Sequence, residues 1–263
     1  MATHLSRSPI KDKPLPLPGQ SVQDAIDTLL WDEIAPYVTF AVALLLLAGF
    51  EWFSVLRHLP PQPWLYSVLA VLACAFAAAK MWRVRIRVQR LKLGRDGERV
   101  VGQYLERLRA DGADVFHDVP GEGFNIDHVV LSAHGFYAIE TKTRSKPVHG
   151  NPRVVLTESG IVVNGFRPDR DPVIQAQAGA RWLAHLLEES TGKQFPVHGV
   201  VLYPGWFVEP MPEAWRKSPD RPWVLEPKAL PTFIEHEPTR ITESDCKLAA
   251  YHLSRYIRMT IAA

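Results

Sequence analysis

The stretch FNIDHVVLSAHGFYAIETK, residues 124–142, decides the fold of the larger part of this 263-residue chain. It contains two strongly apolar, partly alternating runs, Asn125–Leu131 and Phe136–Thr143, the second reaching one residue beyond the stretch. Such runs predict β-strands, and the short connection around Ala133-His134-Gly135 is typical of a hairpin. We therefore expect two antiparallel strands here.

Three ionisable side chains lie on these strands: Asp127 on the first, and Glu140 and Lys142 on the second. Residues two apart on a strand project from the same face. If Ala133 and His134 are the central turn residues, Asp127 lies opposite Glu140. If the turn is centred one residue later, Asp127 lies opposite Lys142. Both registers place the three side chains on one face, whereas a slip by a single residue separates them.

Two carboxylates beside an ammonium group suit a hard divalent cation. Mg²⁺ prefers oxygen ligands, and it lowers the pKa of a bound water and polarises a phosphate. A Glu-x-Lys pair on an exposed strand is usually a solvated ion pair of little energetic value. Here the pair follows the apolar run Gly135–Ile139, where charges are costly without a purpose. The pattern therefore favours phosphodiester hydrolysis.

The flanking sequence predicts further helices and strands. The apolar periodicity indicates helices over Asp96–Arg109, Pro172–Glu189 and Glu243–Met259, the last of which is capped by Thr242. It indicates strands over Ala113–Val119, Val154–Leu156, Ile161–Val163 and Val197–Tyr203. A turn at Glu158-Ser159-Gly160 separates the second and third of these strands. This order predicts an α/β fold, with helices flanking a mixed sheet.

Two uncharged apolar runs precede this part, Ile34–Phe50 and Leu59–Ala79. About 20 apolar residues in a helix cross the hydrocarbon layer of a bilayer. Both runs are apolar all round instead of along one stripe, which favours membrane spans over a buried hairpin of a soluble core. The connector, with Pro60-Pro61-Gln62-Pro63, joins them as a transmembrane hairpin over residues 34–82.

The charges around the hairpin predict its orientation. Six basic residues and no acidic one lie between Lys80 and Leu93. Because positive flanks stay cytoplasmic, we expect both termini inside the cell, with the basic run against anionic lipid. The small residues Ala75 and Ala77–Ala79 would permit a homo-oligomer through close helix packing.

Overall composition sets bounds on the function. The formal net charge is only +2, and because the basic run holds six positive charges, the rest of the chain is net acidic. A uniformly basic nucleic-acid binder is thereby excluded. With 22% charged and 47% hydrophobic residues, the chain is not wholly disordered. Two cysteines are too few for a disulfide framework or a cysteine metal cluster.

Three segments together resemble the nuclease-related domain (NERD) family: GRDGE at 94–98, the stretch 124–142, and DPVIQA at 171–176. The resemblance covers roughly residues 94–204. It implies a restriction-endonuclease-like PD-(D/E)xK core and a nuclease dependent on Mg²⁺ or Mn²⁺, with DNA favoured over RNA as the substrate. Members of this family occur in bacteria and archaea, some of them fused to membrane spans, and we expect this chain to lie in the bacterial inner membrane.

The resemblance assigns roles to five positions. Asp127 and Glu140 match the metal-binding acids, and Lys142 matches the lysine of the motif. Glu98 matches an acid on the first helix that reaches the metal, and Gln175 matches a glutamine on the helix after the core strands. Basic residues near these positions are the expected nucleic-acid contacts: Arg95, Arg99, Arg144, Lys146 and Arg153.

The sequence thus predicts five parts: a tail and short amphipathic segment (1–33), the transmembrane hairpin (34–82), a basic juxtamembrane linker (83–93), a nuclease-like domain (94–204) and an extension ending in a helix (205–263). Residues 1–20 are expected to be a disordered tail. The expected function is a membrane-anchored nuclease. The alternatives are a non-catalytic module of nuclease fold that holds nucleic acid or protein at the membrane, and a scaffold in which the hairpin is primary.

Overall fold

A computed structural model describes residues 15–57, 63–147, 153–157, 160–216, 218 and 220–262. The predicted tail up to residue 14, most of the proline-rich connector and the turn at Glu158-Ser159 lie outside these residues. The chain divides into a unit of residues 21–93 and a unit of residues 94–263 that also includes the chain up to Gln20.

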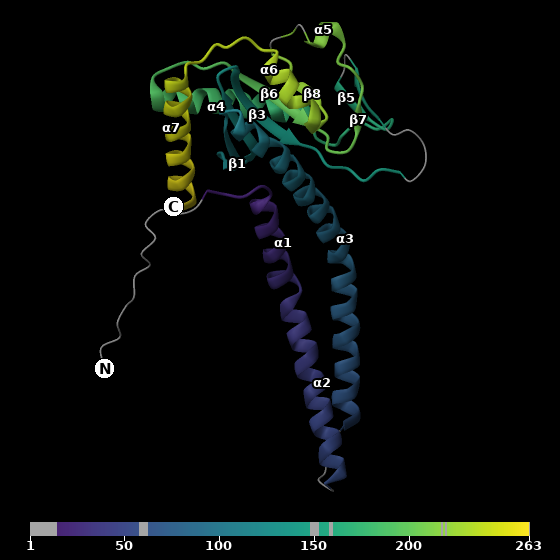
Figure 1. The fold of residues 1–263 in the computed structure, drawn as a ribbon. Coiled ribbons are helices and arrows are strands. Elements are labelled where there is room, and N and C mark those ends of the chain that lie inside the picture. Colours follow the sequence, from purple (N-terminus) through teal and green to yellow (C-terminus); the bar gives the residue numbers. More distant parts are fainter. Residues whose placement is uncertain are drawn as a thin grey trace, which may run out of the picture. The chain divides into compact units, whose positions relative to one another are not determined.

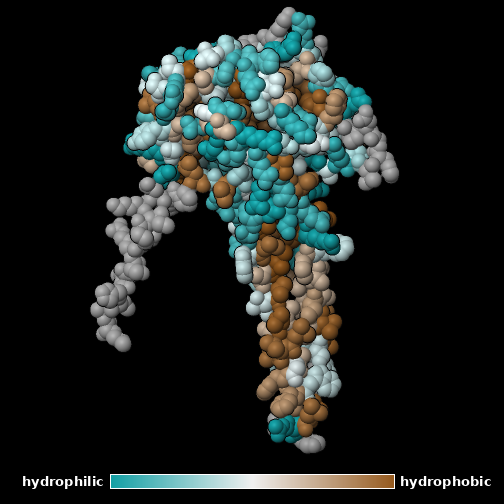
Figure 2. Space-filling view, viewed as in Figure 1, coloured by the Kyte–Doolittle hydropathy of each residue, from teal (hydrophilic) through white to brown (hydrophobic). Residues whose placement is uncertain are grey.

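The unit of residues 21–93 contains α1 (Gln20–Glu33), α2 (Ala35–Leu56) and the first part of α3 (Pro63–Ala110). Helices α2 and α3 run antiparallel: Trp52 Nε1 donates to Ser67 Oγ at 3.1 Å, and the rings of Tyr37 and Phe76 are 5.4 Å apart. Both helices are long and apolar enough to cross a membrane. The apolar surface of the pair is continuous along α2 and the adjoining stretch of α3 (Figure 2).

Helix α1 is amphipathic and packs against the basic stretch of α3. Its Ile26 is buried against Val84 and Val88, and Glu33 pairs with Lys80 at 3.7 Å and with Arg87 at 3.4 Å. The predicted linker 83–93 is a continuous part of α3. The reason is that no proline interrupts the sequence from residue 64 to 110, and the glycines in a helix cost only about 1 kcal/mol each.

The other unit is built on a five-stranded mixed sheet (Figure 1). Its strands are β1 (Asp114–Pro120), β2 (Asn125–Ser132), β3 (Gly135–Thr141), β6 (Val197–Leu202) and β8 (Trp223–Leu225), in the order β1-β2-β3-β6-β8. The first three strands are antiparallel, and β3, β6 and β8 are parallel. A second sheet has the order β5 (Gly160–Val163), β4 (Arg153–Thr157), β7 (Phe207–Val208). The predicted mixed α/β class is confirmed.

The register of the central hairpin is the first of the two that the sequence left open. His128 pairs with Ile139 and Ser132 with Gly135, so Ala133 and His134 are the central turn residues. Continued by one residue, this register places Asp127 opposite Glu140.

Helices cover both faces of the large sheet. On one face, α4 (Pro172–Thr191) and α7 (Glu243–Ala262) bury Leu183 and Leu253 in a core with Phe136. On the other face, the last turns of α3 and α6 (Leu230–Glu235) bury Leu105 and Leu230 in a second core. Short helical turns, α5 (Glu213–Arg216) and η1 (Pro227–Ala229), connect β7, β8 and α6.

Residues outside the predicted 94–204 domain are integral to this unit. The predicted extension supplies β7, β8 and α7, and Thr242 Oγ1 caps α7 by accepting the Asp245 N–H at 3.2 Å. At the other end of the chain, Leu15 packs against the core beneath α4 and α7. The Pro18 side chain fills the space beside Gly102, where a Cβ would lie 2.5 Å from Pro18 Cγ. The prediction of a disordered tail is therefore wrong for residues 15–19, because Leu15 and Pro18 pack within the folded unit.

Candidate functional site

Asp127 is held at the end of the β2–β3 hairpin by the backbone of the neighbouring strand. Its Oδ2 accepts the Thr141 N–H at 2.6 Å. Thr141 is the last residue of β3, so this bond fixes the carboxylate where β3 ends. The distance is typical of a charge-assisted hydrogen bond.

Glu140 and Lys142 form an ion pair beside it. Lys142 Nζ donates to Glu140 Oε1 at 2.5 Å, and the two side chains are 28% and 16% exposed, respectively. Lys142 follows the end of β3, and its backbone N–H donates to Leu202 O at 2.8 Å. This bond continues the β3–β6 pairing and keeps the lysine in line with the strand.

Glu98 reaches this group from α3 because the preceding residue is glycine. A Cβ on Gly97 would lie 1.7 Å from the Oγ1 of Thr143, so only a glycine allows the helix to approach the strand end this closely. Burial, together with the charges of Asp118 and Glu140, raises the pKa of Glu98 to about 7, against the opposing effect of Lys142.

The predicted acids therefore form one electrostatic group. Burial raises the pKa of Asp127 well above its usual range, and the nearby Glu140 and Glu98 charges add to the shift. The Thr141 N–H and Lys142 act in the opposite direction. Carboxylates that crowd in this way favour a proton or a cation among them.

Asp118 belongs to this group and was not predicted. It is buried at the end of β1 with a φ of 52°, and it accepts a hydrogen bond from Asn125 Nδ2 at 2.9 Å. Sequence reasoning treated the run 113–119 as an alternating strand, and nothing local marks Asp118. Only the pairing of β1 with β2 brings it toward Glu98.

Gln175 lies in the first turn of α4, which begins after the N-cap Asp171. Asp171 Oδ1 accepts the Val173 N–H at 2.9 Å, and Pro172 occupies the first helical position. The Gln175 side chain lines a cavity of about 440 Å³ together with Glu140 and Arg170. Its Oε1 is buried and has no hydrogen-bond partner, so it is available to a ligand.

Arg170 also lines a second cavity, of about 280 Å³, with Lys142, Arg144 and Tyr203. Arg170 lines both cavities, the first of which is also lined by Glu140 and the second by Lys142. Sequence reasoning missed Arg170. Its place directly before the capped helix that carries Gln175 is a signal that could have identified it.

Of the five basic residues predicted to contact nucleic acid, Arg144 lines one of these cavities. Arg95 pairs with Asp96 at 2.7 Å, and Arg153 pairs with Glu209 at 2.7 Å. Lys146 lies over the Trp206 ring, 5.6 Å from its centroid, and Arg99 is exposed on α3.

The donor set of the site is all oxygen, which fits Mg²⁺ or Mn²⁺. Within the described part of the chain, however, no three His, Cys, Asp or Glu side chains converge so as to hold an ion by themselves. Mg²⁺ is usually held by one or two carboxylates and keeps several waters. The pair Asp127 and Glu140 fits that requirement, while Glu98 stays a predicted ligand.

Comparison with known proteins agrees with the resemblance seen in the sequence. The family model described as a nuclease-related domain matches residues 93–204. No curated protein and no solved structure matches the chain. The matched segment contains Glu98, Asp127, Glu140, Lys142 and Gln175. Residues 93–204, less than half of the chain, are thus similar to the nuclease-related domain (NERD) family.

Proposed function

We propose that the chain is a membrane-anchored, Mg²⁺-dependent nuclease that cleaves DNA in preference to RNA on the cytoplasmic side. The observation that carries this proposal is the convergence of Asp127, Glu140 and Lys142 at the end of β3. Thr141 N–H holds the first, and a 2.5 Å ion pair joins the other two. The match to the nuclease-related domain supports the same conclusion.

In this proposal Asp127 and Glu140 hold the cation, which would polarise the scissile phosphate and lower the pKa of a water. Lys142 stabilises the negative charge that develops on the phosphate oxygens. Arg144 and Arg170 bind the flanking phosphates from the second cavity, because a guanidinium matches phosphate geometry. Gln175 Oε1, without a partner in the protein, orients a water or a substrate donor in the first cavity.

Cleavage assays of the purified full chain in detergent test the proposal. Single- and double-stranded DNA and RNA are incubated with Mg²⁺, with Mn²⁺ and with EDTA. We expect Mg²⁺-dependent cleavage of DNA, and we expect Asp127→Asn and Glu140→Gln each to lower the rate at least about 100-fold, because each removes a charge that acts on the transition state.

Two controls are needed to interpret the cleavage rates. Arg181→Gln, an exposed position on α4 outside both cavities, should leave the rate unchanged. Equal cleavage by wild type and by Asp127→Asn would identify a contaminating nuclease and refute the catalytic proposal.

A second candidate is a binding module of nuclease fold that does not cut. The two arginines that line the second cavity, Arg144 and Arg170, would serve such a module as phosphate contacts. This module would bind nucleic acid with an affinity that falls steeply with salt and that drops on Arg170→Gln. It would cleave nothing in any of the assays above.

Membrane anchoring is the other part of the proposal. It is supported by the two apolar helices α2 and α3 and by the basic stretch that follows the second span. The protein should stay with the membrane fraction through alkaline carbonate washing. Release into the supernatant would contradict a spanning hairpin.

A further inference from the structure

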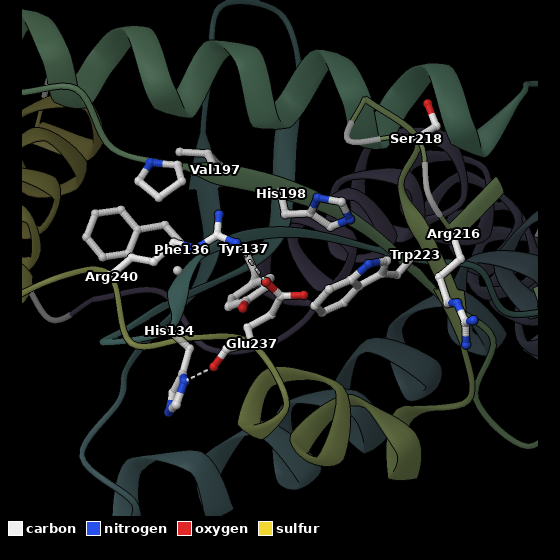
Figure 3. Close-up of a pocket in the computed structure, with 12 residues that line it drawn as sticks. His134, Phe136, Tyr137, Val197, His198, Arg216, Ser218, Trp223, Glu237 and Arg240 are labelled. Carbon is white, nitrogen blue, oxygen red and sulfur yellow. Dashed lines mark hydrogen bonds and ion pairs between the residues drawn. The ribbon is translucent and has the colours of Figure 1, made fainter. Parts of the chain in front are cut away.

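A third pocket lies at the opposite end of β3 from Glu140 and Lys142. Its volume is about 370 Å³, within the range of small-molecule sites. The first residues of β3 and β6 form one side of it, and Arg216, Trp223, Glu237 and Arg240 are among the residues that line the rest (Figure 3). Tyr137 is three residues before Glu140, so along the strand the pocket is about 10 Å from the nuclease site.

The wall of this pocket is a cluster of aromatic rings. Trp223 lies 4.6 Å from the His198 ring, 5.4 Å from Tyr137 and 5.4 Å from Phe233, measured between centroids. Figure 3 shows His198 and Trp223 side by side at the pocket. Because the rings pack against one another, they form a rigid surface that suits a flat, unsaturated ligand.

His198 offers this surface an unused hydrogen-bonding atom. Its Nε2 is buried and has no partner. Burial lowers the pKa of His198 to about 4, so the ring is neutral at physiological pH and has one donor and one acceptor nitrogen. A buried polar atom without a partner costs free energy that a ligand would recover. A ring bearing nitrogen or carbonyl groups supplies such a partner.

The remaining lining attracts an anion. The charged residues that line the pocket are Arg216, Arg240 and Glu237, which together leave one net positive charge. Arg240 is 3.5 Å from Glu237 at its nearest atoms, and its side chain is 55% exposed. His134 Nδ1 donates to the Glu237 carbonyl oxygen at 2.6 Å. A loosely paired guanidinium at a pocket mouth suits a single phosphate group.

We propose that this pocket binds a nucleoside monophosphate. The base lies against the Trp223 wall and hydrogen-bonds to His198 Nε2, and the phosphate reaches Arg240. The volume and the single net positive charge favour one phosphate over two or three. The proposal goes beyond the nuclease activity and does not depend on it.

Calorimetric titration of the full chain in detergent, with EDTA present so that no cleavage occurs, tests the proposal. The probes are the four ribonucleoside monophosphates, the matching nucleosides and inorganic phosphate. We expect saturable 1:1 binding of at least one monophosphate. Its affinity should fall about tenfold in His198→Phe, which keeps the ring and removes both nitrogens, and about tenfold in Arg240→Gln.

Further measurements distinguish a loss of ligand binding from a loss of folded structure. His198→Phe should not lower the thermal unfolding midpoint of the free protein, because Nε2 has no partner to lose. Arg240→Gln should leave nucleoside binding unchanged, and the control Arg181→Gln should change no affinity. Glu140→Gln should bind the monophosphate as tightly as wild type does. A negative result in the nuclease assay can therefore be distinguished from a lack of monophosphate binding. Absent binding, unaltered binding by both variants, or equally tight binding of inorganic phosphate would overturn the proposal.

Discussion

At the scale of the single residue, the most informative side chain is Glu98. It lies where α3 meets the end of β3, close to the carboxylates of Asp118, Glu140 and Asp127. The positive charge of Lys142 partly offsets the repulsion between these carboxylates. This crowding destabilises the fold in the absence of a cation. An arrangement that costs stability is typical of a site kept for binding or catalysis.

The raised pKa of Glu98 predicts how stability depends on pH. The folded pKa of about 7 lies above the ordinary 4.5, so the folded state holds the proton more tightly. The contribution of Glu98 to stability is therefore most favourable below pH 4.5, becomes less favourable as pH rises through this window, and is fully lost above about pH 7. Glu98→Gln removes the penalty and should stabilise the protein by about 1–3 kcal/mol at pH 8, with little effect at pH 4.

Thermal unfolding followed by tryptophan fluorescence, in EDTA at both pH values, measures this effect. Glu122→Gln, an exposed acid near the site, is the matched control and should change neither midpoint. A stabilisation by Glu98→Gln that is equal at pH 4 and pH 8 would show that the carboxylate does not titrate in this window.

At the scale of the element, the placement of α4 decides whether Gln175 reaches the site. The helix packs on β6 at Gly199, where a Cβ would lie 2.8 Å from the backbone oxygen of Ala176. Ala176 is the neighbour of Gln175, so this close approach sets the depth of the glutamine in its cavity. Backbone atoms cannot swing aside as the end of a flexible side chain does.

Gly199→Ala should therefore push α4 away from the sheet. We expect a loss of about 1–3 kcal/mol of stability, as for other overpacked cores, together with slower cleavage. Gly94→Ala is the control: it lies in α3 with nothing within 4 Å of its Cβ position, and should stabilise the helix slightly. Thermal unfolding and the cleavage rate are measured for both. An unchanged midpoint in Gly199→Ala would refute the close packing.

Two features at this scale could not be read from the sequence. The strand β8 has only three residues, too few for periodicity to mark, and it is fixed by pairing with β6. The helix α3 continues for 48 residues across an apolar, a basic and an amphipathic stretch. Composition changes along it twice, but only a proline or a cap would have ended it.

At the scale of the whole molecule, the charges of α1 and α3 bear on membrane orientation. The acidic α1 pairs through Glu33 with Lys80 and Arg87. We expect the other basic residues of the stretch to contact anionic lipid. Because basic residues near the end of a span stay cytoplasmic, we expect both termini inside the cell.

Reporter fusions measure this topology. Alkaline phosphatase fused after Ala263 should be inactive and a fluorescent protein should be bright, whereas phosphatase inserted in the connector after Arg57 should be active. Replacing Arg83, Arg85, Arg90 and Lys92 with glutamine should reduce this asymmetry. Phosphatase activity at the C-terminus of the unaltered chain would contradict the predicted orientation.

By itself, the sequence determined the hairpin of β2 and β3, the helices α4 and α7, the two long apolar runs, and the group of Asp127, Glu140 and Lys142. These features are local: side-chain periods of two and 3.6 residues and the length of an apolar run are written in neighbouring positions. Tertiary structure decided between the two registers of the hairpin, because the sequence on either side of Ala133 and His134 tolerates both.

Tertiary structure also brought in Asp118 and Arg170, joined residues 15–19 and 205–263 to the folded unit, and formed the pocket beside Trp223. Each of these depends on contacts between residues far apart in the chain. No local pattern encodes such contacts, since they are selected by the free energy of the whole packed core.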